Sequence, residues 1–193
     1  MRFETLEIFG AMRVQLAAHV DARGLFGRLY CAQEFREQTQ PFQVVQASLS
    51  VNPQAGTLRG LHFQWPPSRE DKLVRCLRGR LMDVLLDLRP DSPSYLHHQP
   101  VVLAGEARDG VYIPHGVAHG FQTLEDATEV LYMMSDYYVP ELQAGVRWDD
   151  PAFGIRWPLA APVMNDRDRE LPLFDRQTFE RELAIHRGAQ ARA

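Results

Sequence analysis

The chain has 193 residues, of which 45% are hydrophobic and 24% charged, a composition typical of one globular domain with a sizeable core. Its formal net charge of −4 argues against nucleic-acid binding, which needs a clustered basic excess, and no apolar run is long enough to span a membrane. Since there are only two cysteines, Cys31 and Cys76, and no export signal is recognisable, we expect a reduced, cytoplasmic protein.

The elements predicted along the chain are mostly short strands. Residues 31–38 are predicted to form a short helix, and residues 176–193 a helical or frayed tail. Between them, segments rich in Val, Leu, Tyr and Phe are bounded by Gly, Pro, Asp and Ser, as is typical of strands. These segments are 57–64, 72–79, 80–89, 98–105, 110–114, 119–124 and 128–138. Regularly spaced strands with period-two hydrophobicity predict an antiparallel sandwich or barrel, and we interpret residues 1–193 as one domain.

Ionisable residues are concentrated on the predicted strands. They are Arg59, His62, Lys72, Arg75, Asp83, His119 and Tyr132. Taken singly, each except His62 is explained as well by a structural role, such as a solvated strand charge or a core tyrosine with a hydroxyl partner. A single histidine is also a weak signal, so a function has to come from combinations.

One such combination is Pro114-x-Gly116-x-x-His119, in which Pro and Gly form a tight turn and the histidine begins the next strand. This spacing resembles the second signature of the cupin superfamily, whose fold is a jelly-roll β-barrel. Many cupins bind a metal through this signature and a His-x-His in an earlier one.

The earlier signature departs from the metal-binding pattern, because it reads His62-Phe63-Gln64. An amide is a poor ligand for a transition metal beside imidazole. That would leave His62 and His119, with Glu70 as a weak third ligand, where a stable site normally needs three protein ligands. We therefore expect neither a metal nor another cofactor.

Several longer segments support a more specific resemblance. They are "LRGLHFQ", "KLVRCLRGRLMDVLLDLR", "IPHGVAHGF", "EVLYMMSDYY" and "GVRWDDPAFGIRWP", in this order. Together they resemble the dTDP-4-dehydrorhamnose 3,5-epimerase family, metal-free cupins of nucleotide-sugar metabolism, over residues 21–174. The resemblance implies an all-β jelly-roll barrel with short peripheral helices. It also implies an epimerase that inverts C3, C5 or both in a nucleotide-diphosphate-linked 4-keto-6-deoxyhexose.

Other functions remain open at this point. Inversion at a single carbon, or keto-isomerisation, would use the same base. A metal-dependent cupin enzyme and a non-catalytic sugar-nucleotide module are alternatives from other classes.

The resemblance assigns four catalytic roles. His62 is the expected base, and its partner is an aspartate late in the chain, Asp168 or, in a shifted register, Asp166. Lys72 is expected to stabilise the enolate oxygen. Tyr132 is the expected acid on the opposite face, a suitable donor if nearby Lys72 lowers its pKa.

The resemblance also implies substrate contacts and an assembly. The expected substrate-binding residues are Arg23, Phe26, Gln46, Arg59, Asp83, His119 and Tyr138. The two arginines suit a diphosphate, because a guanidinium donates paired hydrogen bonds to phosphate. Where the family usually has a glutamate after "RGLF", the chain has Gly27 and Arg28, which leaves the nucleotide base and the sugar open. A homodimer is expected, with residues near the N-terminus crossing to the partner.

Arg59 and His62 pose a geometric problem. They are three residues apart, so a flat strand would point them to opposite faces. If both line one pocket, Gly60 between them is predicted to mark a bulge that redirects one side chain.

Overall fold

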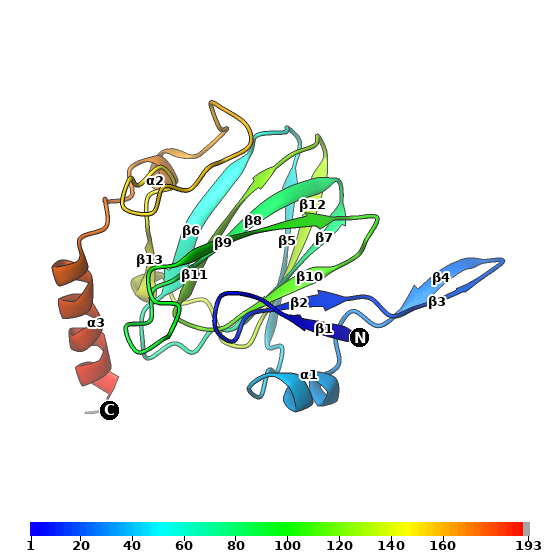
Figure 1. The fold of residues 1–193 in the computed structure, drawn as a ribbon, viewed down its shortest axis with the longest axis horizontal. Coiled ribbons are helices and arrows are strands. Elements are labelled where there is room, and N and C mark those ends of the chain that lie inside the picture. Colours follow the sequence, from blue (N-terminus) through cyan, green and yellow to red (C-terminus); the bar gives the residue numbers. More distant parts are fainter. Residues whose placement is uncertain (191–193) are drawn as a thin grey trace.

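Two antiparallel sheets face each other in the computed structural model, which describes residues 1–190 (Figure 1). The six-stranded sheet has the order β1-β2-β10-β7-β12-β5, and the five-stranded sheet β13-β6-β11-β8-β9. The strands are β1 (Arg2–Thr5), β2 (Met12–Gln15), β3 (Ala18–Asp21), β4 (Gly24–Gly27), β5 (Gln46–Asn52), β6 (Leu58–Gln64), β7 (Lys72–Arg78), β8 (Arg80–Asp87), β9 (His98–Ala104), β10 (Gly110–Ile113), β11 (Val117–Thr123), β12 (Thr128–Met134) and β13 (Gln143–Gly145). This architecture confirms the predicted jelly roll.

Three α-helices lie outside the sheets in the described part of the chain. They are α1 (Ala32–Gln38), the four-residue α2 (Asp166–Arg169) and α3 (Arg176–Gln190). The predicted early helix and helical tail are thus confirmed, while residues 191–193 of that tail lie outside the described residues. None of the helices within residues 1–190 is long and apolar enough to cross a membrane.

Strand β8 shows how the core is divided. It lies in the middle of its sheet, between β11 and β9, and both of its faces are buried. Leu81 and Leu85 pack into the cluster between the two sheets. Val84 and Leu86 point the other way, into a cluster completed by α3. The period-two pattern predicted this alternation, and the structure shows that both faces are buried, one between the sheets and the other against α3.

Strand β5 was not predicted, and its hydropathy explains why. Gln46, Ser48 and Ser50 point into a pocket between the sheets, whereas Leu49 and Val51 on the outer face are 58% and 54% exposed. The polar residues therefore face inward and the apolar ones outward, which is the reverse of the usual pattern for a half-buried strand.

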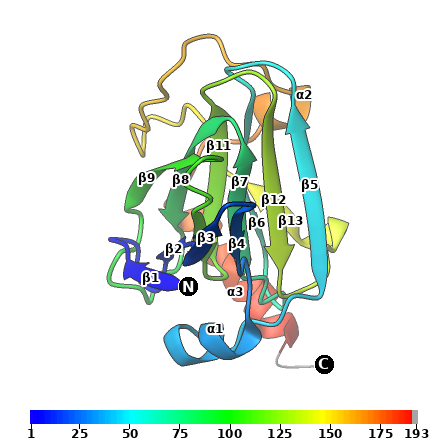
Figure 2. The same ribbon diagram turned by 90° about the vertical axis from the view of Figure 1, so that its right-hand side faces the viewer.

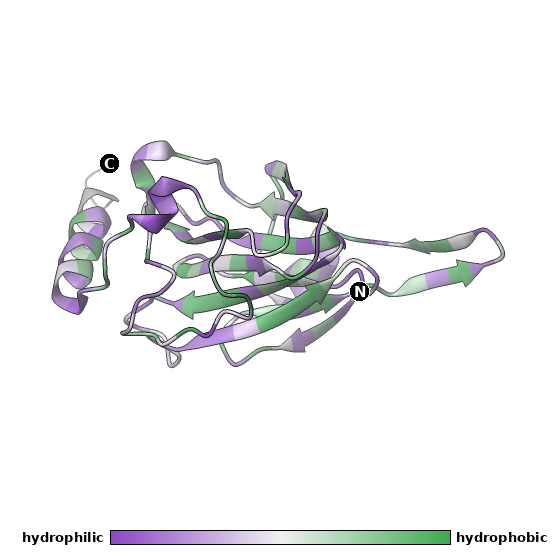
Figure 3. Ribbon diagram, turned by 90° about the horizontal axis from the view of Figure 1, so that it is seen from above, coloured by the Kyte–Doolittle hydropathy of each residue, from purple (hydrophilic) through white to green (hydrophobic). Residues whose placement is uncertain are grey.

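The hairpin β3–β4 projects away from the two sheets and forms its own two-stranded sheet (Figures 1 and 3). Its base is held by Arg75, a fully buried residue of β7. The Arg75 guanidinium donates hydrogen bonds to the carbonyl oxygens of Val14 and Leu29, which lie on either side of the hairpin in the chain. Burial lowers the pKa of Arg75 to about 10, so the side chain remains charged at neutral pH.

Both cysteines are free thiols, Cys31 half-buried and Cys76 buried. Cys76 lies in the cluster between the sheets, where burial raises the pKa of its thiol to about 11. At neutral pH it is therefore an uncharged member of the core.

Candidate active site

A pocket of about 360 Å³ opens between the two sheets and collects residues from both. Most of the residues predicted for catalysis or substrate binding line it: Gln46, Arg59, His62, Lys72, His119, Tyr132, Tyr138 and Asp168. Asp83 lies behind the wall, fully buried, where its Oδ1 is 3.3 Å from His119 Nδ1.

His62 and Asp168 form a hydrogen-bonded pair at the five-stranded sheet. His62 Nε2 lies 2.7 Å from Asp168 Oδ1, and Asp168 Oδ2 accepts a hydrogen bond from the Gly60 N–H at 3.1 Å. Within residues 1–190 the other ring nitrogen, His62 Nδ1, has no protein partner, so it can accept a proton from a bound molecule. Asp166, the alternative partner, is exposed on the outer side of α2.

Helix α2 places the Asp168 carboxylate. Asn165 is its N-cap residue, and its side-chain oxygen accepts a hydrogen bond from the Asp168 N–H at 2.7 Å. Burial by itself would raise the pKa of Asp168, but the hydrogen bond from His62, the charge of His62 and the Gly60 N–H together hold it below its ordinary value. The carboxylate is therefore ionised at neutral pH and can stabilise an imidazolium.

A bulge at Gly60 brings Arg59 and His62 into the same pocket, as predicted. His62 pairs with His119 of β11, but Arg59 pairs with Phe121, so three steps along β6 match two along β11. Gly60 has φ +115°, and a Cβ there would lie 2.5 Å from the Gly120 Cα. Only glycine fits this close approach of two strands.

Tyr132 faces the pocket from the six-stranded sheet. Its ring centroid lies 5.8 Å from that of His119. Burial, and then the negative charge of Asp83, raise the pKa of the Tyr132 phenol, while the charge of Arg59 opposes them. The expectation that Lys72 lowers this pKa is therefore wrong, and the phenol is a protonated donor at neutral pH.

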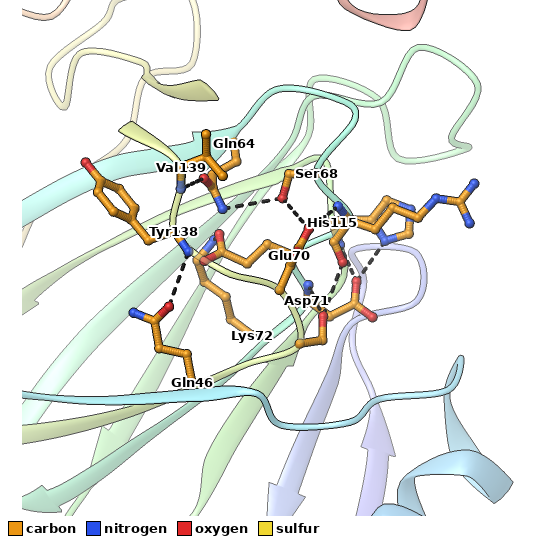
Figure 4. Close-up of polar contacts among 12 residues, drawn as sticks. Gln46, Gln64, Ser68, Glu70, Asp71, Lys72, His115, Tyr138 and Val139 are labelled. Atoms are coloured by element: carbon orange, nitrogen blue, oxygen red, sulfur yellow. Dashed lines mark hydrogen bonds and ion pairs between the residues drawn. The ribbon is translucent and has the colours of Figure 1, made fainter. Parts of the chain in front are cut away.

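The two cations of the pocket, Lys72 and Arg59, have different partners, a carboxylate and a neutral amide. Lys72 Nζ lies 2.7 Å from Glu70 Oε2, and both side chains are mostly buried (Figure 4). The Arg59 Nε donates a hydrogen bond to the side-chain oxygen of Asn52, the last residue of β5, at 3.0 Å. This bond orients the Arg59 guanidinium.

Arg23 and Phe26, the remaining predicted residues, lie on the projecting hairpin rather than in the pocket of their own chain. The Arg23 side chain is 90% exposed and pairs with Asp21. Phe26 is 78% exposed. Figure 2, viewed from the hairpin side, shows β3 and β4 in front of the sheets.

The pocket also contains residues that the sequence analysis did not assign to it. They are Ser48, Ser50, Phe63, Gln64, Glu70, Met134, Gln143 and Asn165. Ser48 and Ser50 lie two and four residues after Gln46, so strand alternation would have placed them on the same face as this predicted pocket residue. An asparagine three residues before Asp168 is a typical helix N-cap. Among residues 1–190, no group of three His, Cys, Asp or Glu side chains is placed to hold a metal ion.

Comparison with known proteins shows the family to which the chain belongs. The model of the dTDP-4-dehydrorhamnose 3,5-epimerase family matches residues 5–176. The chain belongs to this family. The dTDP-4-dehydrorhamnose 3,5-epimerase of Sinorhizobium fredii is 38% identical over 173 residues, which is 89% of each chain. The predicted family, a family of carbohydrate epimerases, is thus confirmed.

Two solved structures of family members share the fold. That of dTDP-4-dehydrorhamnose 3,5-epimerase from Bacillus anthracis, with TDP and PPi bound, has a TM-score of 0.87 and 34% identity, covering 90% of this chain and 99% of that one. That of ChmJ, a 3'-monoepimerase from Streptomyces bikiniensis in complex with dTDP-quinovose, has a TM-score of 0.84 and 31% identity, covering 96% of each chain.

Proposed function

We propose that this protein inverts C3 and C5 of a dTDP-linked 4-keto-6-deoxyhexose. The observation that carries the proposal is that a base and an acid face one pocket from opposite sheets. The His62–Asp168 pair belongs to the five-stranded sheet and its α2 neighbour, and Tyr132 to the six-stranded sheet. A sugar ring between them could lose a proton on one face and gain one on the other.

The reaction needs no redox step. His62 removes the proton from the carbon beside the C4 ketone, and the electron pair of that C–H bond moves to the ketone oxygen, giving an enolate. The ammonium of Lys72 stabilises the negative oxygen, and Asp168 stabilises the imidazolium. Tyr132 then donates its phenolic proton to the opposite face of the carbon as the ketone reforms. The phenolate and the imidazolium return to their starting states by proton exchange with solvent.

Two observations support a nucleotide as part of the substrate: the presence of Arg59 in the pocket and the ligands of the solved relatives. Arg59 carries a guanidinium suited to a diphosphate, and Gln46, Ser48 and Ser50 offer hydrogen-bonding groups along β5. The TDP and the dTDP-quinovose bound in the two solved relatives support a thymidine nucleotide.

We further propose a homodimer in which each β3–β4 hairpin reaches the partner's pocket. The hairpin exposes Val20 and Phe26, at 77% and 78%, and the outer face of β5 exposes Leu49 and Val51. Apolar side chains exposed in this way on a projecting hairpin and on a sheet edge suit a contact between copies of the chain. In such a dimer, Arg23 of one chain would reach the diphosphate bound in the pocket of the other. Light scattering that shows a monomer at micromolar concentration would contradict the proposal.

Inversion at one carbon is the second candidate, because one of the similar structures is that of a 3'-monoepimerase. The two candidates use the same base and acid and differ in which carbons exchange their protons. One experiment, which follows the exchange of each of these protons with solvent, therefore distinguishes the two candidates.

The experiment is incubation with the dTDP-linked 4-keto-6-deoxyglucose in deuterated water, followed by NMR. We expect deuterium at both C3 and C5 and inverted configuration at both carbons; exchange at C3 alone would support the second candidate. His62→Asn should abolish exchange, whereas Tyr132→Phe should permit exchange but block inversion. A wild-type protein that exchanges neither proton would refute the proposed function for this substrate.

A further inference from the structure

The segment of residues 135–139, here called the Tyr138 segment, crosses from one sheet to the other at the pocket. It leaves the end of β12 in the six-stranded sheet and continues through a 3₁₀ turn (Pro140–Leu142) into β13 of the five-stranded sheet. Tyr138 lines the pocket, yet it is 46% exposed. The segment belongs to no strand or helix, and its first residue is held by a backbone hydrogen bond from the Ser135 N–H to the Asp71 carbonyl. The position of Tyr138, further along, depends on side chains that bind the neighbouring peptide groups.

Gln64 binds the peptide groups on both sides of Tyr138 (Figure 4). Its side-chain oxygen accepts a hydrogen bond from the Val139 N–H at 2.8 Å, and its amide donates to the Tyr137 carbonyl at 3.2 Å. The same amide donates to the Ser68 hydroxyl at 3.3 Å. Gln64 is only 8% exposed, so these bonds are made away from bulk water, where an unpaired group is costly.

Two more glutamines bind Tyr138 itself. The Gln46 side-chain oxygen accepts the Tyr138 N–H at 3.2 Å, and the Gln143 side-chain oxygen accepts the Tyr138 hydroxyl. Gln46 belongs to β5 of one sheet, while Gln143 pairs with Gln64 in the other. Tyr138 is therefore held from both sheets, at its backbone and at the end of its ring.

We propose that Gln64 is a positioning residue that, with Gln46 and Gln143, holds the Tyr138 ring in the pose that contacts the sugar nucleotide. At the place where many cupins have a second metal-binding histidine, this chain has an amide whose oxygen and nitrogen bind backbone instead. The contact with substrate rests on the proposed function, but the holding of the ring does not. A ring fixed before binding lowers the ordering cost of binding.

The test is Gln64→Met, which keeps the length of the side chain and removes its hydrogen bonds. We expect KM for the sugar nucleotide to rise about tenfold, the effect of one or two lost buried hydrogen bonds. The kcat should change less than about twofold, because His62, Lys72 and Tyr132 stay in place. In a Tyr138→Ala background, Gln64→Met should add nothing to KM, whereas a general structural defect would add its full effect.

Gln122 provides a matched control. It is fully buried on β11, does not line the pocket, and binds Leu159 in the same two-sided way, at 2.8 Å to the carbonyl and 2.9 Å from the N–H. Gln122→Met should therefore cost comparable stability in urea unfolding while KM stays within about twofold of wild type. An equal rise of KM in both variants would overturn the proposal.

A second readout needs no substrate. In protein labelled with 3-fluorotyrosine, the ¹⁹F resonance missing from Tyr138→Phe belongs to Tyr138. We expect this resonance to shift or broaden in Gln64→Met and to remain as in wild type in Gln122→Met. An unchanged resonance in Gln64→Met would refute the holding of Tyr138 even if the protein is an epimerase, and a changed one would support it even if it is not. If Gln64→Met does not fold, Gln46→Met at a half-buried site removes a bond to the Tyr138 N–H and none to its ring, and it gives a second spectral test of holding through the backbone.

Discussion

At the scale of the residue, the ionised carboxylate of Asp168 decides how His62 can work. Asp168→Asn keeps the shape of the side chain but removes the charge that would stabilise the imidazolium, so we expect kcat/KM to fall about 100-fold or more. Asp166→Asn, two residues away on the exposed side of α2, should leave kcat/KM within about twofold. Steady-state kinetics of the two variants checks this, and equal losses would show that the pairing with His62 is not what matters.

The same carboxylate predicts a pH dependence of stability. Because the pKa of Asp168 is lower in the folded protein than its ordinary value of about 3.9, its ionisation stabilises the fold above that value, and this contribution is lost as pH falls through the lower folded pKa. The free energy of unfolding of wild type should therefore exceed that of Asp168→Asn at pH 7. Urea unfolding at a series of pH values should show this difference shrinking below about pH 4. A difference that does not vary with pH would contradict the carboxylate's role.

At the scale of the element, the bulge in β6 directs two side chains into one pocket. Gly60→Ala places a methyl group 2.5 Å from the Gly120 Cα in addition to straining the backbone, so we expect a loss of about 3–5 kcal/mol and loss of activity. Gly24→Ala is the matched control, since its φ of +121° imposes similar strain but no atom lies within 4 Å of the added Cβ. That variant should lose only about 1–2 kcal/mol. Urea unfolding of both checks the prediction, and equal losses would mean that the contact between β6 and β11 is not tight.

At the scale of the whole molecule, the hairpin separates Arg23 from the pocket of its own chain. If it serves the partner, an Arg23→Ala chain and a His62→Asn chain should complement each other, because their mixed dimer contains one pocket with both groups intact. With random assortment, half of the dimers are mixed and each has one intact site, so we expect about a quarter of wild-type activity from two nearly inactive parents.

The control for this mixing experiment pairs His62→Asn with Lys72→Ala. Both residues belong to the pocket of their own chain, so no mixed dimer contains a complete site and activity should stay at the level of the parents. If the Arg23→Ala mixture likewise gains no activity, Arg23 does not act across a dimer.

The sequence by itself determined most of the strands that pass through the core, although not β2, which carries the buried Val14. Seven segments with Val, Leu, Tyr and Phe at period two correspond to strands β6 to β12, because burial selects the same apolar pattern wherever two sheets face each other. The roles of His62, Lys72 and Tyr132 were assigned by resemblance to the family, because the segments around these residues are distinctive. Strand β5 was not predicted, because the side chains that it points into the pocket are polar. Its hydrophobic pattern is therefore the reverse of that of a strand whose inner face is apolar.

Only the tertiary structure decided which residues meet. It selected Asp168 over Asp166 through the cap of a four-residue helix, since a shift of two residues there points the side chain to the opposite side. The sequence showed only that Gln64 stands where many cupins have a metal-binding histidine, whereas the structure shows that its amide binds the peptide groups beside Tyr138. What an amide binds depends on the neighbours that folding brings to it. The structure also shows that Arg23 and Phe26 lie outside the pocket of their own chain. The direction in which their hairpin projects is set by contacts at its base with Arg75, a residue far along the chain.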